Sequence, residues 1–469
     1  MRGSNKWSFR PYTRLHQTNR ANVPYICSLA PFADGFSFEW FDRGSNGEHK
    51  LVVHKLHTYD DPIEYKVADS VVRIEGLEKG VTYEIALWRE DMSASSVTRL
   101  VRTGATFGTV VNYNHPKDSK MYDISGQFLG APSILKLPSG KLLCCMEVHG
   151  DFSELVSLIF ESLDGGLSWH YVTDLAPCHM PKLFWHKDKL YCIAAGPGDI
   201  VIGCSEDEGR NWSTPERIVV GLRNDDYRCH KGACPIVVHN GRLYTTFEYG
   251  SWKGWNYGYS LISIDLNDDL MVAENWIYTD LAFVDRSKEG MPKAPAVTTV
   301  ECNAVVLPDD TVGIITRLDP KEPIEYYSNK AMISRQNPND PEGALEFDRI
   351  VDMPCGIRNK FCVRKVPNSS YYIATCNENT EDYTWGRGIL TLAVSEDLVN
   401  WRVAKRIVDV RRDTRYGDMK MVAYSDSDFD FDGDDLIVVT RTADNEPSNH
   451  HDNNYVNFFR VENYRQYLL

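Results

Sequence analysis

The sequence predicts an all-β protein in which a small β-sandwich precedes a β-propeller of six or seven blades. Three observations support this prediction: many short segments alternate apolar and polar residues, one segment carries the pattern of a tyrosine corner, and a turn motif repeats at the spacing of propeller blades. We expect an N-terminal extension at residues 1–22, the sandwich at residues 23–104 and the propeller at residues 105–469.

Short strands account for most of the hydrophobic pattern. Segments with period-two alternation are bounded by Gly, Asn, Asp and Pro, and long amphipathic helical windows are scarce. Clear examples occur at residues 51–57, 141–148, 189–195, 242–250 and 435–443. Hydrophobic residues make up 42% of the 469 residues, which is enough to build a sizeable core.

The composition argues against several functions. A formal charge of −15 disfavours general binding to nucleic acid or to anionic membranes. The chain starts without an apolar stretch of signal-peptide length, and no segment approaches the ~20 apolar residues of a membrane helix, so we expect a cytoplasmic protein. The twelve cysteines include no Cys-x-x-Cys pair; we expect buried thiols, no metal site and no cofactor.

Residues 23–104 carry the signature of a β-sandwich. Leu77 stands six residues before Tyr83 with a turn between them, as in a tyrosine corner, where the phenol hydroxyl bonds back to the backbone. With Trp40 at the end of an alternating segment upstream, this region resembles a fibronectin type III domain. It contains no catalytic constellation, so we expect it to pack on the main domain or to bind a partner.

A turn motif repeats in the rest of the chain. The pattern Ser-x-Asp-x-Gly-x-x-Trp occurs at residues 162–169 and again 43 positions later, at 205–212, and a shorter copy without the glycine occupies 395–401. In such a turn the Ser and Asp side chains bind backbone N–H groups, the glycine takes a positive φ and the tryptophan packs underneath. A period of ~40–50 residues predicts propeller blades of four strands each.

These repeats resemble the Asp boxes, or BNR repeats, of the sialidase-like β-propellers. Further segments across residues 105–469 resemble those of uncharacterised bacterial proteins of the sialidase family: TVVNYNHP, FLGAPSILKLPSGKLL, GDIVIGCSEDEGRNW, HNGRLY and FDGDDLIVVTRTA. The resemblance implies a sialidase-like propeller, with functional residues spread over all blades at the mouth of the central channel.

One position argues against sialidase activity itself. Sialidases bind the sugar carboxylate with three arginines, and the resemblance implies that the first would lie within Leu129–Ile134. Gly130 occupies that position here. Because a bidentate arginine–carboxylate contact is among the stronger hydrogen-bonded pairs, we expect no efficient sialidase and keep an exo-sialidase as an alternative.

Two segments suggest catalytic groups in the middle of the propeller. His230 and Lys231 lie just before a strand, where the uncharacterised relatives carry a similar His-Lys; histidine suits proton transfer and lysine can hold a carboxylate. Glu248 ends an apolar strand and is followed by Trp252, whose ring can stack on a sugar. The structural alternatives are a solvated basic loop and aromatic rings that only cover a blade edge.

Basic residues recur near strand ends in the later blades. Arg317 and Arg441 end apolar strands, whereas Lys360 and Arg387 stand at strand starts, with Trp385 beside Arg387. Each of these residue types is more often found at the surface. Their recurrence in a protein of negative net charge nevertheless favours a shared, substrate-binding pocket for an anion.

The last blade adds a possible acid/base group. His451 is followed by Asp452, which can orient a histidine for proton transfer. The adjacent His450 would point to the opposite face of a strand, so joint metal ligation is not expected. The acidic segment 427–435 lacks the glutamate of an EF-hand loop, and its Asp432-Gly433 pair predicts a hairpin.

Together these patterns predict a carbohydrate-active enzyme that cleaves a terminal anionic sugar from a short oligosaccharide, by hydrolysis or by β-elimination. For hydrolysis, the candidate carboxylates are Glu248, Glu301 and Asp426. For elimination, the candidate neutralising cations are Arg317, Arg441 and Lys231, and the candidate bases are His230, His451 and a tyrosine. A non-catalytic propeller that binds a glycan or a protein is the alternative of another class. Oligomerisation is left open.

Overall fold

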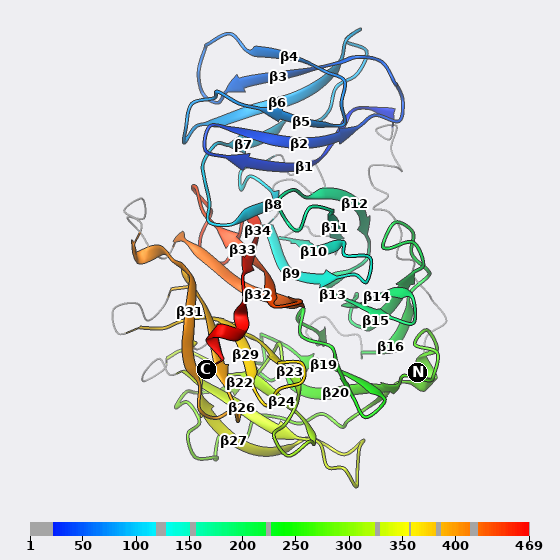
Figure 1. Ribbon diagram of the computed structural model, residues 1–469, viewed down its shortest axis with the longest axis vertical. Coiled ribbons are helices and arrows are strands. Elements are labelled where there is room, and N and C mark those ends of the chain that lie inside the picture. The colour runs from blue at the N-terminus through cyan, green and yellow to red at the C-terminus, as the bar shows by residue number, and fades with distance from the viewer. Residues whose placement is uncertain are drawn as a thin grey trace.

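A computed structural model describes residues 22–118, 128–150, 156–221, 227–323, 329–355, 358–380, 386–412 and 421–468. Within these ranges the regular elements are strands and three short 3₁₀ turns, η2 (Ala273–Asn275), η3 (Val410–Arg412) and η5 (Tyr464–Tyr467), so the predicted all-β class is confirmed. A two-sheet unit forms one end of the molecule, and a larger body of successive sheets forms the rest (Figure 1). No helix in the described part of the chain is long and apolar enough to span a membrane.

The N-terminal unit is a sandwich of two antiparallel sheets. The first sheet contains β1 (Tyr25–Phe32), β2 (Gly35–Phe41) and β5 (Val71–Ile74). The second contains β4 (Ile63–Val67), β3 (His49–Lys55), β6 (Thr82–Arg89) and β7 (Arg99–Arg102), in that order. Alternating residues such as Phe36, Phe38 and Leu51 fill the core between the sheets. The Tyr83 hydroxyl accepts a hydrogen bond from the Glu78 N–H at 3.0 Å, as expected at a tyrosine corner.

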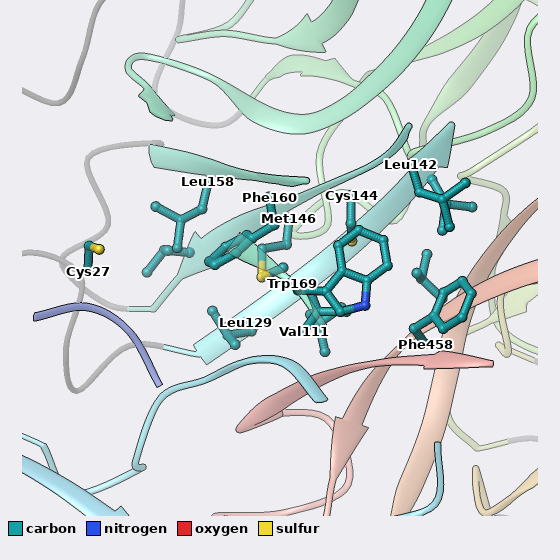
Figure 2. Close-up of a cluster of buried hydrophobic side chains, with 14 of the residues drawn as sticks. Cys27, Val111, Leu129, Leu142, Cys144, Met146, Leu158, Phe160, Trp169 and Phe458 are labelled. Atoms are coloured by element: carbon teal, nitrogen blue, oxygen red, sulfur yellow. The ribbon is translucent and has the colours of Figure 1, made fainter. Parts of the chain in front are cut away.

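The sandwich packs firmly on the larger body. Tyr25 and Cys27 of β1 belong to a hydrophobic cluster with Val111 and Leu129, and Cys27 lies at its edge (Figure 2). The Glu39 carboxylate reaches across the interface, where it accepts a hydrogen bond from the Tyr171 N–H at 2.5 Å. These contacts position the sandwich without bringing it into the centre of the larger body.

Six sheets follow one another in the larger body, and we name them sheets 1 to 6. Their strands, in hydrogen-bonded order, are as follows. Sheet 1 has β9 (Phe128–Lys136), β10 (Leu142–His149), β11 (Val156–Ser162) and β12 (His170–Leu175). Sheet 2 has β13 (His179–His186), β14 (Lys189–Ala195), β15 (Ile200–Ser205) and β16 (Glu216–Val219). In sheet 3, β17 (Arg228–His230) and β18 (Val237–His239) both pair with β19 (Arg242–Gly250), which is followed by β20 (Gly258–Asp265) and β21 (Ile277–Tyr278).

The remaining sheets complete the series. Sheet 4 has β23 (Asn303–Val306), β24 (Val312–Arg317), β26 (Lys330–Arg335) and β27 (Glu346–Asp352), and a small pair, β22 (Val297–Thr298) with β25 (Asp319–Pro320), lies outside it. Sheet 5 has β28 (Cys362–Lys365), β29 (Tyr372–Asn377), β30 (Ile389–Ser395) and β31 (Arg402–Asp409). Sheet 6 has β32 (Ala423–Asp432), β33 (Asp435–Ala443), β34 (Tyr455–Val461) and β8 (Thr109–Tyr113).

The arrangement of these sheets is propeller-like. The first strands of sheets 1 and 2 lie beside each other, as do those of sheets 3 and 4, 4 and 5, and 5 and 6, and β32 of sheet 6 returns to lie beside β9 of sheet 1. Sheet 6 takes its outermost strand, β8, from the beginning of the region, which ties the two ends of the chain segment together. In a propeller, such first strands line a central channel and the later strands lie progressively outward.

The repeated motif forms the same hydrogen-bonded turn in sheets 1, 2 and 5, always between the third and fourth strands. In the first copy the Gly166 N–H donates to Ser162 Oγ at 2.8 Å, and the Ser168 N–H donates to Asp164 Oδ1 at 2.9 Å. The shorter third copy keeps the side-chain contacts of Asp397 with the backbone, and Leu398 takes the positive φ in place of glycine. The turn chemistry predicted for the repeat is thus present in all three copies.

The cysteines behave largely as predicted. All twelve are free thiols; eleven are buried and Cys204 is half-buried. The Asp432-Gly433 pair forms the predicted hairpin between β32 and β33, since Asp432 pairs with Asp435 in the register.

Candidate functional site

The propeller-like fold gathers polar side chains at one end of the central channel. In an antiparallel sheet, the start of the first strand lies beside the end of the second strand, so side chains from both meet at the same end. In sheet 3, His230 pairs with Glu248 in this way. In sheet 6, Ser425 pairs with Arg441.

Asp426, near the start of β32, lies at the centre of a group of cations. Arg441 Nε lies 2.9 Å from Asp426 Oδ2, and Lys360 Nζ donates to the Asp426 backbone oxygen at 3.4 Å. Burial opposes the charge of Asp426, but the surrounding cations, Arg441 and Arg387 foremost, outweigh it and hold the pKa of this carboxyl far below its usual range. Asp426 is therefore ionised at any pH at which the protein would work.

Arg317, the last residue of β24, joins the same group through Glu301. Its Nη1 lies 2.8 Å from Glu301 Oε2, and its Nε donates to Asp319 Oδ2 at 2.9 Å. Glu301 and Asp426 both have left-handed backbone conformations, with φ of 60° and 48°. Such conformations cost on the order of 1–3 kcal/mol for residues other than glycine and cluster at functional sites.

Arg387 forms no ion pair among the described residues, whereas Arg441 Nε and Glu301 Oε2, which also lack a hydrogen bond, each lie in an ion pair. Its Nη2 donates to the Arg358 backbone oxygen at 3.5 Å, but its Nη1 is buried and has no hydrogen-bond partner among the described residues. Burial lowers the pKa of Arg387 to about 10, because Asp426 compensates only in part and Arg441 adds repulsion. A buried guanidinium nitrogen without a partner is unfavourable, and a bound anion would supply the missing acceptor.

His230 and Glu248 form a pair on neighbouring strands of sheet 3. His230 Nδ1 lies 2.8 Å from Glu248 Oε2, and Glu248 Oε1 accepts a hydrogen bond from the Cys302 N–H at 2.9 Å. Burial opposes the charge of Glu248, but the His230 ring outweighs it and lowers the pKa of the carboxyl. The Tyr257 ring stands 5.7 Å from the His230 ring, edge to face.

The two lysines predicted to bind substrate lie deeper than expected. Lys231 and Lys360 are 1% and 2% exposed. Lys231 Nζ donates to Thr245 Oγ1 at 2.8 Å, and burial lowers the pKa of this lysine to about 8. Both lysines therefore lie in the channel wall, and their contact with a substrate stays a prediction.

The structure adds three polar residues that the sequence analysis did not single out: Glu147, His149 and His179. Glu147 Oε2 lies 2.6 Å from His179 Nδ1 and accepts a hydrogen bond from the Met180 N–H at 3.1 Å. A Cβ atom at Gly130 would come within 2.8 Å of Glu147 Oε1, so the Glu147 side chain fills the space beside this glycine. Glu147 stands near the end of a second strand, as Glu248 does, and this shared position is the signal that could have found it.

His451 lies near Arg441 and Arg387 on one side and near His149 of sheet 1 on the other. Its Nδ1 lies 2.9 Å from Asp452 Oδ1, and its ring stands 6.0 Å from the ring of His149. The charge of Arg441 and partial burial lower the pKa of His451, although Asp452 opposes the shift. The side chain is 57% exposed, so a ligand can reach it.

Aromatic residues border the cluster on one side. Trp252 is 36% exposed, and its ring lies 5.3 Å from both the Trp255 and the Tyr257 rings. Trp255 Nε1 donates to the Asp319 backbone oxygen at 2.7 Å, which connects these rings to the partner of Arg317. Trp385, also predicted to contact substrate, lies outside the described residues.

A second buried carboxylate, Asp428, lies deeper in the channel. Its Oδ2 accepts a hydrogen bond from the Ile134 N–H at 2.9 Å and forms an ion pair with Lys182. Its Oδ1 accepts from Arg364 Nη2 at 3.3 Å and from Cys362 Sγ at 3.4 Å. Asp428 thus joins sheets 1, 2, 5 and 6 at the axis of the fold.

The described residues include no candidate metal centre. Within the described ranges, no group of three or more His, Cys, Asp or Glu residues is arranged to hold a metal ion.

A cavity of about 580 Å³ lies at the opposite end of the channel, where Val238, Val306 and Lys365 mark the ends of first strands. This cavity is separate from the cluster around Asp426.

Comparisons with known proteins bear on the fold. A scan against protein-family models gives no match, and a search of curated proteins gives no match. Among solved structures, a protein of unknown function from Dyadobacter fermentans is 13% identical, with a TM-score of 0.50 over 75% of this chain and 97% of that chain. An α-L-arabinanase from Penicillium chrysogenum is 13% identical, with a TM-score of 0.49 over 76% of this chain and 98% of that chain.

A sialidase from Trypanosoma rangeli is also similar, at 13% identity and a TM-score of 0.46 over 71% of this chain and 54% of that chain. The arabinanase and the sialidase are glycosidases by name. At these identities the Dyadobacter structure supports the fold alone, and the scores of the two glycosidases carry no functional argument.

Proposed function

We propose that the protein is a carbohydrate-active enzyme, either an exo-acting glycoside hydrolase or a glycan lyase, that acts on a terminal anionic sugar of a short glycan. The observation that carries this proposal is Arg387, whose buried Nη1 lacks a partner beside Asp426 and two further arginines. A carboxylate on the substrate would complete the hydrogen bonding of this guanidinium.

The charge of the cluster agrees with a monoanionic ligand. Four cations, Arg317, Lys360, Arg387 and Arg441, stand with three carboxylates, Glu301, Asp319 and Asp426. One positive charge is therefore in excess. A single carboxylate, such as that of a uronic acid, would neutralise it without leaving a further buried charge.

The neighbouring aromatic rings favour a sugar over a simple acid. Trp252 is partly exposed beside Trp255, which is linked through Asp319 to Arg317. Flat rings next to an anion site suit a pyranose, because the ring faces pack on C–H groups while the arginines hold the carboxylate. A protein-binding propeller would not need an unsatisfied arginine in its channel.

A second candidate, an exo-sialidase, is favoured by one observation. Arg317, Arg387 and Arg441 form a group of three arginines around Asp426, and the family that residues 105–469 resemble uses three arginines for its substrate carboxylate. Against it, Glu147 fills the space beside Gly130, where the resemblance implies the first of those arginines. We expect a chromogenic sialoside to be turned over far below the ordinary kcat of roughly 1–1,000 per second.

Binding of a monosaccharide acid tests the proposal directly. Titration calorimetry should detect glucuronate binding to the wild type and no comparable binding of glucose. Arg387→Met should weaken glucuronate binding by about 10- to 100-fold, because one charge-assisted contact is lost. Arg349→Met, at an exposed arginine on β27, serves as the matched control and should bind as the wild type does. Equal binding of glucose and glucuronate would contradict an anionic substrate.

The proposed domain assignment rests on sequence patterns and on the order of the strands. We take sheets 1 to 6 as six blades of a sialidase-like propeller and the sandwich as a fibronectin type III-like domain; the strand orders and the Tyr83 contact support this assignment. We further propose an oligosaccharide as the partner, no nucleic acid or membrane partner, and a cytoplasmic location.

A further inference from the structure

Three histidines of the site share one arrangement. In His179, His230 and His451, the Nδ1 atom lies 2.6–2.9 Å from a carboxylate oxygen. The carboxylates belong to Glu147, Glu248 and Asp452. At His230 and His451 this contact is a hydrogen bond, whereas His179 Nδ1 forms none. A carboxylate bonded to Nδ1 orients the ring and leaves Nε2 as the nitrogen that can exchange a proton with a ligand.

The carboxylates of the described site are already engaged. Glu147 and Glu248 contact histidines, and Asp426 and Glu301 contact arginines. Burial opposes the charge of Glu147, but His179 outweighs it and lowers the pKa to about 2. Hydrolysis by a pair of carboxyl groups needs one of them protonated as the acid, whereas the neighbouring histidines and cations lower the pKa of Glu147, Glu248 and Asp426.

For His451, the charge of Arg441 is the largest cause of the lowered pKa, and Arg387 contributes in the same direction. The groups that face it are Arg441 from β33, Arg387 and Asp426 from sheets 5 and 6, His149 from β10, and Asp452 in its own loop. A sugar carboxylate held by Arg387 and Arg441 would therefore bring the carbon next to that carboxylate toward the imidazole of His451.

We propose that the site cleaves its substrate by β-elimination, with His451 as the base and His230 as the acid. This inference rests on the proposed function and names its reaction and substrate: a terminal uronate at the reducing end that carries another sugar on O4. His451 Nε2 takes the hydrogen of C5, and the arginines stabilise the negative charge that spreads onto the carboxylate. The C4–O bond then breaks as the C4=C5 double bond forms, and the leaving oxygen receives a proton from His230 Nε2.

The surroundings of His451 suit a base. Arg441 and partial burial lower its pKa, so the ring is neutral at pH 7 and can accept a proton. When a substrate carboxylate neutralises part of the arginine charge, the proton affinity of His451 rises, because the repulsion on the imidazolium falls. The same cations thus bind the substrate carboxylate and, once the substrate is bound, allow His451 to accept a proton more readily.

Product analysis separates this reaction from hydrolysis. The wild type should be incubated with short oligosaccharides whose uronate is 4-linked, and the products should be measured by mass and by ultraviolet absorbance. Elimination gives product masses that add up to the substrate mass, together with the absorbance of a conjugated C=C bond. Products heavier by one water and without that absorbance would overturn elimination and leave the proposed glycan-cleaving function intact. Failure to cleave any such oligosaccharide, combined with no glucuronate binding, would overturn both.

Variants then test the two histidines. His451→Ala and His230→Ala should each lower kcat by about 100- to 10,000-fold, the contribution of a general acid or base. His239→Ala is the matched control, because His239 lies at the opposite end of the channel and should keep wild-type kcat. Since His451 is 57% exposed, its replacement should leave the melting temperature nearly unchanged. Full kcat in both the His451 and the His230 variant would reject the assignment.

Discussion

Asp426 and Asp428 stand two residues apart on β32, and both are buried and surrounded by cations, yet they differ in how complete their partners are. Asp428 accepts hydrogen bonds from a backbone N–H, a lysine, an arginine and a thiol, which belong to three other sheets. Asp426 has a strained left-handed backbone, and the cations around it include Arg387, whose Nη1 has no partner in the described part of the chain. A buried guanidinium nitrogen without a hydrogen-bond partner also lies beside Asp428, at Arg364 Nε. The difference therefore lies in the carboxylates themselves: four donors hold the Asp428 carboxylate, whereas Asp426 has an ion pair with Arg441 and a left-handed backbone. The comparison teaches that a carboxylate with a full set of donors marks a structural ion pair, and that one with few donors and a strained backbone marks a place for a ligand.

The largest effect is expected at the complete site. Asp428→Asn removes the charge that faces Lys182 and Arg364, and the lysine is left buried without a counter-charge. We expect the free energy of unfolding to fall by about 3–5 kcal/mol, the usual cost of breaking a buried pair. Urea denaturation at pH 7 measures it, with the exposed Asp268→Asn as a control that should change stability by less than about 0.5 kcal/mol. A loss in Asp428→Asn as small as in the control would break the comparison.

Asp426→Asn should have a smaller effect that an added anion can reverse. The variant leaves Arg387 and Arg441 without their nearest carboxylate, and we expect a loss of about 2–3 kcal/mol. Formate can enter a site that a ligand normally occupies, so it should raise the melting temperature of Asp426→Asn. It should raise that of Asp428→Asn less, because the Asp428 side chain is fully buried. Equal rescue of both variants would show that the two carboxylates do not differ in access.

His149, beside the site, should make the free energy of unfolding depend on pH. Burial lowers the pKa of His149 to about 4, from the 6.5 expected in the unfolded chain. The neutral ring therefore contributes stability that is fully present above pH 6.5 and is lost as the pH falls toward 4. We expect His149 to account for a loss of about 2 kcal/mol between pH 7 and pH 5. Urea unfolding at both pH values should show a smaller loss in His149→Gln, and an identical loss in the variant and the wild type would exclude His149 as the source.

Part of the site could be predicted because residue type and strand position are local. Glu248, Arg317 and Arg441 end or nearly end apolar second strands, and the structure brings all three to the same end of the channel. The neighbouring Asp452 was one reason to propose His451, and its Oδ1 lies 2.9 Å from His451 Nδ1. Glu147 could have been found by the same rule, since it nearly ends β10.

Other features of the site could not be predicted, because they depend on partners that are far apart in the sequence. Lys231 and Lys360 are charged residues beside strands, but only the packing of sheets 3, 5 and 6 shows that their side chains turn into the interior. The pairing of His179 with Glu147 joins two sheets, and neither residue alone signals it. Trp385 lies outside the described residues, and its predicted contact stays a prediction.

The sequence by itself determined the all-β class and the repeated turns, because period-two alternation and the hydrogen bonding of Ser, Asp and Gly act over a few residues. It also determined which residue types stand near the strand ends. The tertiary structure decided which of these side chains share a counter-charge: Asp426 meets Arg441 on its own sheet, and Lys360 and Arg387 from sheet 5. Coulomb interactions and burial depend on distance in space, and only the packing of the sheets against one another sets those distances.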